Sequence, residues 1–262
     1  MLGEIDFNLK TQKPELFLCK PDFSVIAKLN SSYSKSLKLK LGNINELTFK
    51  VPYEIDINHN LVRNPHVDLI KLRYIIKLRL NDKEEYYLIS KNPSDNMGDN
   101  EDYKSVYCLS LPIELKDKLI RDYSVQSYNA EEILNDVLSN TIWTIDYIDA
   151  TFNLMYRSFD FSNNTILDCV IKIAETFSAL IIWDTGNRKI SLFKPDNVGI
   201  NRGLKFSYGK YLKSLNKDYD NESFCTQLKV FGKDGMSIQR VNPTGSNYIE
   251  SFEYFMFPFQ RD

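Results

Sequence analysis

The two histidines of the chain, His59 and His66, are the residues that most invite a metal site. They share one loop-like stretch, and Asp56 and Asp68 flank it with carboxylates that could complete a set of ligands. The spacing matches no zinc motif, and ordinary loop residues explain it equally well. Neither histidine stands near a nucleophile elbow, so a Cys–His or Ser–His catalytic pair is not indicated.

The other reactive side chains are scattered along the sequence. The four cysteines form no CxxC pair, which favours separate reduced thiols over a disulfide framework or a zinc site. They are Cys19, Cys108, Cys169 and Cys225. The acid pairs Glu84-Glu85 and Glu131-Glu132 are typical of solvated turns and helix starts rather than of acid–base catalysis.

The glycines do not form a phosphate-binding loop. Gly232, Gly235 and Gly245 are spaced for turns, unlike the glycines of GxxxxGK or GxGxxG motifs. The sequence therefore assigns no catalytic, cofactor-binding or metal-binding residue. This absence favours a scaffold or binding role.

Composition limits the class of protein. A chain of 262 residues with 43% hydrophobic residues can bury a sizeable core and is long enough for more than one domain. Its 33 basic and 35 acidic residues are mixed along the chain, so no basic stripe indicates specific nucleic-acid binding. The N-terminus is no secretory signal, and no apolar run is long enough for a membrane segment.

Residues 1–110 are predicted to be β structure almost throughout. Two alternating strands flank the turn Gly42-Asn43, and a longer strand over 70–80 turns at Asn81-Asp82 into a partner strand. Their apolar faces are Leu37, Leu39 and Leu41; Leu47, Phe49 and Val51; and Ile70, Leu72, Tyr74, Ile76, Leu78 and Leu80, with Ile75 the one apolar exception on the other face. Residues 91–102 are predicted to be an exposed, mobile loop before a strand at Tyr103–Leu111. Short strands with turn-rich joints favour a barrel or a sandwich.

Residues 111–200 predict a small α+β domain. Asn129 is a good N-cap for a helix over Ala130–Ser139, and Asn164 or Thr165 caps a second helix that reaches Phe177. A short strand containing Trp143 lies between the helices. A hairpin follows, with strands at Ala179–Trp183 and Ile190–Phe193 joined by a turn over 184–187.

Residues 201–262 are again predicted to be mainly β structure. In Phe224–Glu250, Leu228 and Val230 alternate with polar residues, Lys233-Asp234-Gly235 predicts a hairpin turn, and Met236 and Ile238 resume the alternation. Asn242-Pro243-Thr244-Gly245 predicts a second turn. The last residues carry an aromatic cluster that either docks into something or belongs to a longer protein. This cluster is Phe252, Tyr254, Phe255, Phe257 and Phe259.

Several stretches together resemble one protein family. They are SNTIWTIDYIDA (139–150), Arg157-Ser158, NTILDCVIKIAETFSALIIWDTGNRKISLF (164–193), RGLKFSYGKYLKSL (202–215), LKVFGKDGMSIQRVNPTGSNYIESFEYF (228–255) and, in the first domain, GNINELTFKVPYE (42–54). They look like the tail-associated hub family, the N-terminal part of phage and prophage "endopeptidase tail" or minor structural proteins of Gram-positive hosts. The combination VFGKDG, VNPTG and YIE is the most specific of these motifs.

The resemblance implies an α+β, mostly β fold like that of a baseplate hub, with β-barrel tube domains and an inserted small α+β domain. The expected domains are a tube barrel over 1–110, the α+β domain over 111–200, and an incomplete start of a second barrel over 201–262. The resemblance also implies a homotrimer at the virion tail tip, assembled in the bacterial host cytoplasm. Expected partners are a hexameric distal tail protein, the tape-measure protein and receptor-binding proteins.

The resemblance implies a structural role. We expect a hub that joins the distal tail ring to a receptor-binding or lytic tip and closes or guides the DNA channel. The family's lytic activity belongs to a C-terminal extension that has no counterpart in these 262 residues, so we expect no enzyme activity here. Two alternatives stay open: a cell-wall-degrading tail endopeptidase, and a carbohydrate- or receptor-binding module.

Overall fold

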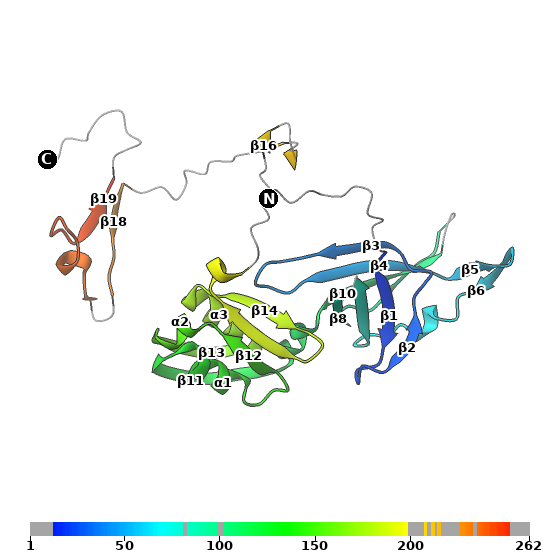
Figure 1. The fold of residues 1–262 in the computed structure, drawn as a ribbon, viewed down its shortest axis with the longest axis horizontal. Coiled ribbons are helices and arrows are strands. Elements are labelled where there is room, and N and C mark those ends of the chain that lie inside the picture. Colours follow the sequence, from blue (N-terminus) through cyan, green and yellow to red (C-terminus); the bar gives the residue numbers. More distant parts are fainter. Residues whose placement is uncertain are drawn as a thin grey trace. The chain divides into compact units, whose positions relative to one another are not determined.

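The computed structural model of the chain describes residues 13–80, 83–98, 102–198, 207–208, 211–212, 214–215, 226–232 and 235–251. The chain separates into two compact units, the first ending at Asn201 and the second beginning at Arg202. The first unit holds one large sheet and a smaller α+β region (Figure 1). The turn Asn81-Asp82 and the aromatic cluster of 252–259 lie outside the described residues.

The large sheet is antiparallel throughout and has eight strands. They are β1 (Glu15–Cys19), β2 (Val25–Lys28), β3 (Tyr33–Lys38), β4 (Glu46–Pro52), β7 (Ile75–Leu80), β8 (Lys83–Ile89), β9 (Ser94–Asn96) and β10 (Tyr103–Ser110). Their order is β2-β1-β7-β8-β10-β4-β3, with β9 also paired to β10. The predicted strand at Leu47, Phe49 and Val51 is confirmed by β4, where these three residues are buried and their neighbours are not.

Part of the sheet is covered on both faces. Leu18 and Cys19 are neighbours in β1, and Ile75 and Ile76 are neighbours in β7, yet the members of each pair lie in different hydrophobic clusters. One cluster, the sheet core, is formed within the sheet and its connections. The other, the helix core, continues from the sheet into the α+β region. A strand covered on both faces loses its simple alternation.

The structure corrects the prediction of a single strand over residues 70–80 in two respects, its start and the burial of Ile75. The strand begins at Ile75, because Arg73 adopts a positive φ of 65° and Tyr74 lies before the strand. Ile75 is not an exposed exception but is 2% exposed, within the helix core. The prediction that residues 91–102 form a single loop was also wrong, because β9 lies in this stretch and pairs with β10.

The predicted barrel is not closed among the described residues. Strands β2 and β3 end the sheet order and do not pair with each other. The leucines near β3 were expected to be buried, but Leu39 is 67% and Leu41 87% exposed. The reason is positional: β3 ends at Lys38, at the edge of the sheet, and Leu39 and Leu41 follow it outside both hydrophobic clusters of the described residues.

A smaller hairpin of β5 (Glu54–Ile57) and β6 (Asn60–Arg63) extends from the large sheet (Figure 1). Its turn residues Asn58 and His59 have φ values of 55° and 64°. Two successive positive φ values define the tight turn that matches the twist of a hairpin.

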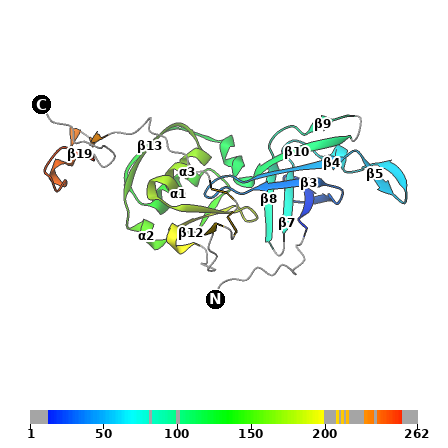
Figure 2. The same ribbon diagram turned by 90° about the horizontal axis from the view of Figure 1, so that it is seen from above.

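Among the described residues, the α+β region contains two longer helices, one short helix and two small sheets, and β13 curves past α1 and α3 (Figure 2). The elements are β11 (Leu119–Tyr128), α1 (Ala130–Leu138), β12 (Thr144–Ile148), the short α2 (Ala150–Asn153), β13 (Arg157–Thr165), α3 (Ile166–Phe177), β14 (Leu180–Asp184) and β15 (Lys189–Phe193). β11 pairs with β13, and the second sheet has the order β12-β15-β14. The sequence prediction had missed the β11–β13 ribbon.

Both predicted helix starts are confirmed. Asn129 and Glu132 form a reciprocal capping box at α1, with hydrogen bonds of 3.0 and 2.9 Å. Thr165, one of the two caps considered, accepts from the Asp168 backbone N–H at α3. Ser178 ends α3 in the left-handed conformation with φ 53°. The α+β, mostly β fold class is therefore confirmed, whereas the division at 110 and 200 stays a prediction.

The second unit is described only in part. Short strands β16 (Ser207–Tyr208) and β17 (Tyr211–Leu212) pair with each other, and β18 (Gln227–Lys229) pairs with β19 (Tyr248–Glu250). The predicted return strand at Met236 and Ile238 is shorter than expected: the Gly232 N–H donates to the Met236 carbonyl at 2.7 Å and Ser237 forms an antiparallel bridge with Phe231, but Ile238 already begins a 3-10 helix.

The two glycine turns of the second unit differ in how much of them is described. The turn 242–245 is confirmed by a 2.9 Å hydrogen bond from the Gly245 N–H to the Asn242 carbonyl, with φ of Gly245 at 69°. Gly235 also has positive φ, at 76°. Lys233 and Asp234 lie outside the described residues.

Candidate functional site: a polar joint within the first unit

The histidines and their carboxylate neighbours serve the hairpin and the loop after it. His59 is exposed at the β5–β6 turn. The Asp68 carboxylate accepts three hydrogen bonds from the Arg63 guanidinium, at 2.9, 2.9 and 3.1 Å, so it is already engaged. Within the described part of the chain, no group of three or more His, Cys, Asp or Glu side chains is placed to hold a metal.

The three described cysteines are buried and unbridged. Burial raises the pKa of the Cys19 and Cys108 thiols, and it raises the pKa of Cys169 to about 11. A thiol with a raised pKa carries little thiolate at neutral pH and is a poor nucleophile. Cys225 lies outside the described residues.

Three members of the two acid pairs, Glu84, Glu85 and Glu132, have structural roles. Glu84 accepts from Arg79 at 2.6 and 2.8 Å, and these hydrogen bonds hold the pKa of its carboxyl below the usual value. Glu85 accepts from the Tyr87 hydroxyl at 2.5 Å. Glu132 belongs to the capping box, whereas Glu131 is an exposed residue on α1.

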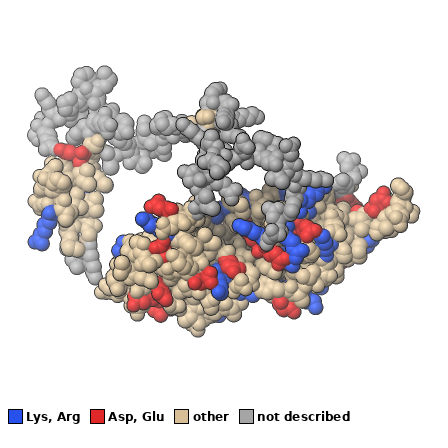
Figure 3. All heavy atoms as spheres, viewed as in Figure 1, with Lys and Arg blue, Asp and Glu red and all other residues tan. Residues whose placement is uncertain are grey.

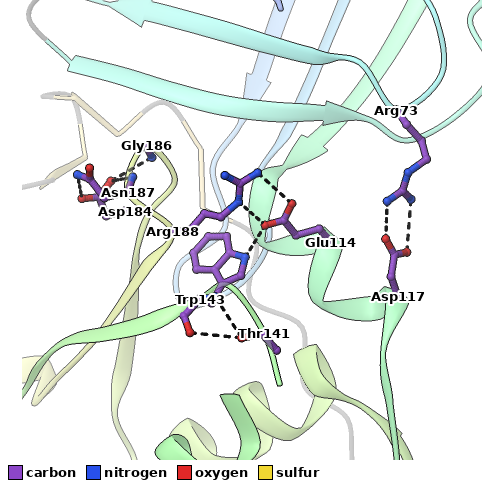
Figure 4. Close-up of polar contacts among 9 residues, drawn as sticks. All are labelled: Arg73, Glu114, Asp117, Thr141, Trp143, Asp184, Gly186, Asn187 and Arg188. Carbon is purple, nitrogen blue, oxygen red and sulfur yellow. Dashed lines mark hydrogen bonds and ion pairs between the residues drawn. The ribbon is translucent and has the colours of Figure 1, made fainter. Parts of the chain in front are cut away.

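A carboxylate that the sequence did not single out connects the large sheet to the α+β region. Glu114 lies in the 3-10 helix Leu111–Asp117, directly after β10. Its Oε1 accepts from Trp143 Nε1 at 2.6 Å and from Arg188 Nε at 2.8 Å (Figure 4). One carboxylate thus ties together the end of the sheet, the start of β12 and the β14–β15 turn.

The indole of Trp143 forms the apolar side of this joint. It is 1% exposed and packs edge-on against Trp183 with a centroid distance of 5.6 Å. An indole this deeply buried needs a partner for its N–H, and Glu114 supplies it. Thr141 Oγ1 accepts from the Trp143 backbone N–H at 3.1 Å and fixes the chain just before β12 (Figure 4).

Arg188 reaches the sheet by a second contact. Its guanidinium lies over the ring of Phe23 at 4.4 Å, and Phe23 packs edge-on against Tyr86 at 4.7 Å. Arg188 itself has a positive φ of 53° at the hairpin turn. The hairpin is also bonded to β8 through Thr185, whose Oγ1 accepts from the Tyr86 backbone N–H at 2.9 Å.

The hairpin turn that presents Arg188 is held by its own carboxylate. Asp184 accepts from the backbone N–H groups of Gly186 and Asn187, each at 3.0 Å, and from the Asn187 side chain at 2.8 Å (Figure 4). Burial raises the pKa of Asp184, but these hydrogen bonds to the charged form outweigh it and leave the pKa below its usual value.

A second ion pair, between Arg73 and Asp117, links the segment before β7 to the end of the same 3-10 helix at the surface (Figure 4). The hydrogen bond to Asp117 raises the pKa of Arg73. The side chains are 57% and 50% exposed, compared with 19% for both Arg188 and Glu114. Exposed ion pairs contribute little to stability, so Glu114 is the dominant polar contact of the joint.

The joint is suited to mechanical coupling. Its central polar groups, the Glu114 carboxylate, the Trp143 indole N–H and the Arg188 guanidinium, pair with one another across three elements. Together with the helix core, which continues from the sheet into the α+β region, the joint connects these two parts of the first unit.

Comparison with known proteins places this fold in a class. The structure is similar to the crystal structure of prophage tail protein gp18 from Listeria monocytogenes EGD-e, with a TM-score of 0.59 at 13% identity, over 84% of this chain and 64% of that one. At that identity the likeness shows the fold, which is that of a prophage tail protein.

Sequence comparison adds a relative. The SPbeta prophage-derived uncharacterized protein YomG of Bacillus subtilis (strain 168) is 34% identical over 248 residues, which cover 94% of this chain and 28% of YomG. Residues 18–108 match the family model described as the YOMG N-terminal domain. The resemblance to phage and prophage tail-associated proteins is confirmed, and the chain spans little more than a quarter of the length of this relative.

Proposed function

We propose that this chain is a structural hub at the tail tip of a long-tailed phage or prophage. In this role it joins the distal tail ring to the receptor-binding or lytic tip and closes or guides the DNA channel. The observation that carries the proposal is the Glu114 joint, which locks a tail-protein fold into one body. A part that transmits load between rings needs such a connection.

The surface supports a passive conduit. Basic and acidic side chains are interspersed over the face of the first unit drawn in Figure 3. The net charge of −2 gives no general attraction for DNA phosphates, whose binding needs clustered cations. DNA could pass such a surface without being held.

None of the described helices is long and apolar enough to cross a bilayer. We place the protein in the virion tail, with assembly in the host cytoplasm. Its proposed partners are two further copies of itself, the hexameric distal tail protein, the tape-measure protein and receptor-binding proteins.

The same proposal assigns no enzyme activity to these 262 residues. The support is chemical: the described thiols are buried, and Glu132, Asp184 and Glu114 are engaged in a helix cap, a turn and an ion pair. A zymogram on cell walls of the host checks this. We expect no cleared zone from the purified chain, and cell-wall lysis would overturn this part of the proposal.

Light scattering tests the hub assignment. For the full-length protein we expect a mass three times that of one protomer. A strictly monomeric full-length protein at micromolar concentration would contradict a trimeric ring. Glycan-array screening of the same sample covers the remaining alternative, since tight selective glycan binding would favour a receptor-binding module.

A further inference from the structure

A groove in the α+β region runs beside a strand edge that has no partner among the described residues. Strand β12 ends the sheet β12-β15-β14 and pairs only with β15. The groove has a volume of about 570 Å³, and all five residues of β12, Thr144–Ile148, line it. An unpaired edge offers a row of backbone donors and acceptors to an incoming strand.

The opposite wall of the groove is one face of helix α1 and its end. Glu131, Asn135, Leu138 and Ser139 line it, and their spacing of four, three and one residues puts them on the same side of the helix. A helix facing a free strand edge across a groove is the arrangement in which extended peptides add a strand to a sheet.

Two hydrogen-bond acceptors in the groove, the Asn153 amide oxygen and the Glu131 carboxylate, have no partner among the described residues. Asn153 lines the groove, and its Oδ1 is buried without a hydrogen-bond partner. Asp146 is already paired with Lys189 at 2.7 Å. Glu131 has no ion pair with any described residue, so its carboxylate is available to a cation. A buried acceptor without a partner favours a ligand that supplies donors.

We infer that this groove binds an extended peptide segment of a partner protein, which adds a strand beside β12 and places a lysine or arginine against Glu131. Backbone N–H groups of the peptide supply donors to the strand edge, and its basic side chain supplies the charge that the groove lacks. Alternate side chains of the peptide would face the groove floor at Trp143. This inference does not depend on the hub role.

The edge also carries a feature that limits the register. The pairing of β12 with β15 shifts between Ile145 and Tyr147, which leaves Asp146 as an extra residue. Such a bulge bends a strand locally. We therefore expect the peptide to bind in one register, on one side of the bulge, rather than to slide along the whole edge.

The test uses the full 262-residue chain and a display library of random dodecapeptides. We expect selected peptides to be rich in lysine or arginine, and synthetic copies to bind in a fluorescence anisotropy assay. N-methylation of alternate peptide nitrogens should weaken binding by about tenfold or more, because it removes the donors that strand addition needs.

Matched protein variants locate the site. Glu131→Lys should weaken binding of the selected peptide by about tenfold, since it reverses the free charge of the groove. Glu175→Lys, an exposed acid on α3 outside the groove, should leave binding unchanged. Thermal melts of both variants show whether they fold, and slower amide exchange of 144–148 on peptide binding supplies a second readout in the unaltered chain.

Three outcomes would overturn the inference. One is the selection of no peptide at all. Another is binding that neither N-methylation nor Glu131→Lys weakens. The third is retention of a glycan in place of peptides, with loss of that glycan in Glu131→Lys, which would make the groove a sugar site.

Discussion

The two units of the chain have similar β-rich sequences but differ sharply in burial. In the first unit, alternating strands build a sheet core and a helix core that include Phe49, Tyr87 and Trp143. In the second unit, no described residue of 226–232 or 235–251 is buried. Phe231 and Met236 are both 66% exposed, and Val241 is 82% exposed.

The difference shows that an alternating pattern does not determine burial. Alternation sets which residues share a face, but a covering layer decides whether that face leaves water. In the first unit, α1 and α3 supply such a layer over one face of the sheet. A two-stranded pairing such as β18–β19 is marginal without a third element, so the described part of the second unit has little stability of its own.

The largest predicted effect is at Trp143. Replacing Trp143 by Ala removes a fully buried indole and one donor to Glu114, so we expect the free energy of unfolding to fall by about 4 kcal/mol. Urea denaturation followed by circular dichroism measures it. A loss below about 1 kcal/mol would mean that the joint does not hold the first unit together.

The next effect is at Glu114. Glu114→Ala leaves Arg188 and the Trp143 indole N–H without their acceptor, so we expect the free energy of unfolding to fall by about 2 kcal/mol. This loss is smaller than for a fully buried pair because the Glu114 and Arg188 side chains are each 19% exposed. The matched control is Asp117→Ala in the same 3-10 helix, which breaks an exposed ion pair and should cost less than about 1 kcal/mol. Equal losses for the two variants would refute the ranking of these contacts.

Glu132 and Glu114 show which interactions the sequence could predict and which it could not. The cap at Asn129 was predictable because its partner Glu132 is three residues away. The partners of Glu114 lie 29 and 74 residues away, so no local pattern marks it. The β11–β13 ribbon escaped prediction for the same reason, since α1 and β12 separate its strands.

The predictions for leucine-rich strands failed for a different reason. Leu47 and Leu39 stand in equally regular alternations, yet Leu47 is 1% and Leu39 67% exposed. Leu47 lies within β4, inside the sheet, whereas Leu39 follows the end of the edge strand β3, and only the tertiary arrangement distinguishes them. Likewise, the unpaired edge of β12 depends on tertiary topology and could not be read from residues 144–148 alone.

A smaller effect on stability is expected when the pH is lowered. The pKa of Asp184 is lower in the folded chain than in the unfolded chain, so its contribution is complete above the unfolded value near 4 and is lost as pH falls through the folded value. We expect the urea midpoint of the unaltered chain to drop between pH 6 and pH 3, and Asp184→Asn to reduce that drop. The control is Asp160→Asn, whose carboxylate has no hydrogen bond to a described residue; an identical effect in both variants would contradict the assignment.

The smallest effect is expected in the second unit. Phe231→Ala removes a large aromatic side chain, but one that is 66% exposed, so the free energy of unfolding should change by less than about 0.5 kcal/mol. The same urea experiment measures it beside Trp143→Ala. A loss comparable to that of Trp143→Ala would show that the two units do not differ in the way that their burial indicates.

The most direct test of the hub proposal is electron microscopy of the full-length protein mixed with the distal tail protein of the same phage. We predict a three-fold ring of this protein seated on the six-fold distal tail ring. Distal tail rings that remain bare, with the full-length protein free and monomeric, would contradict the proposal.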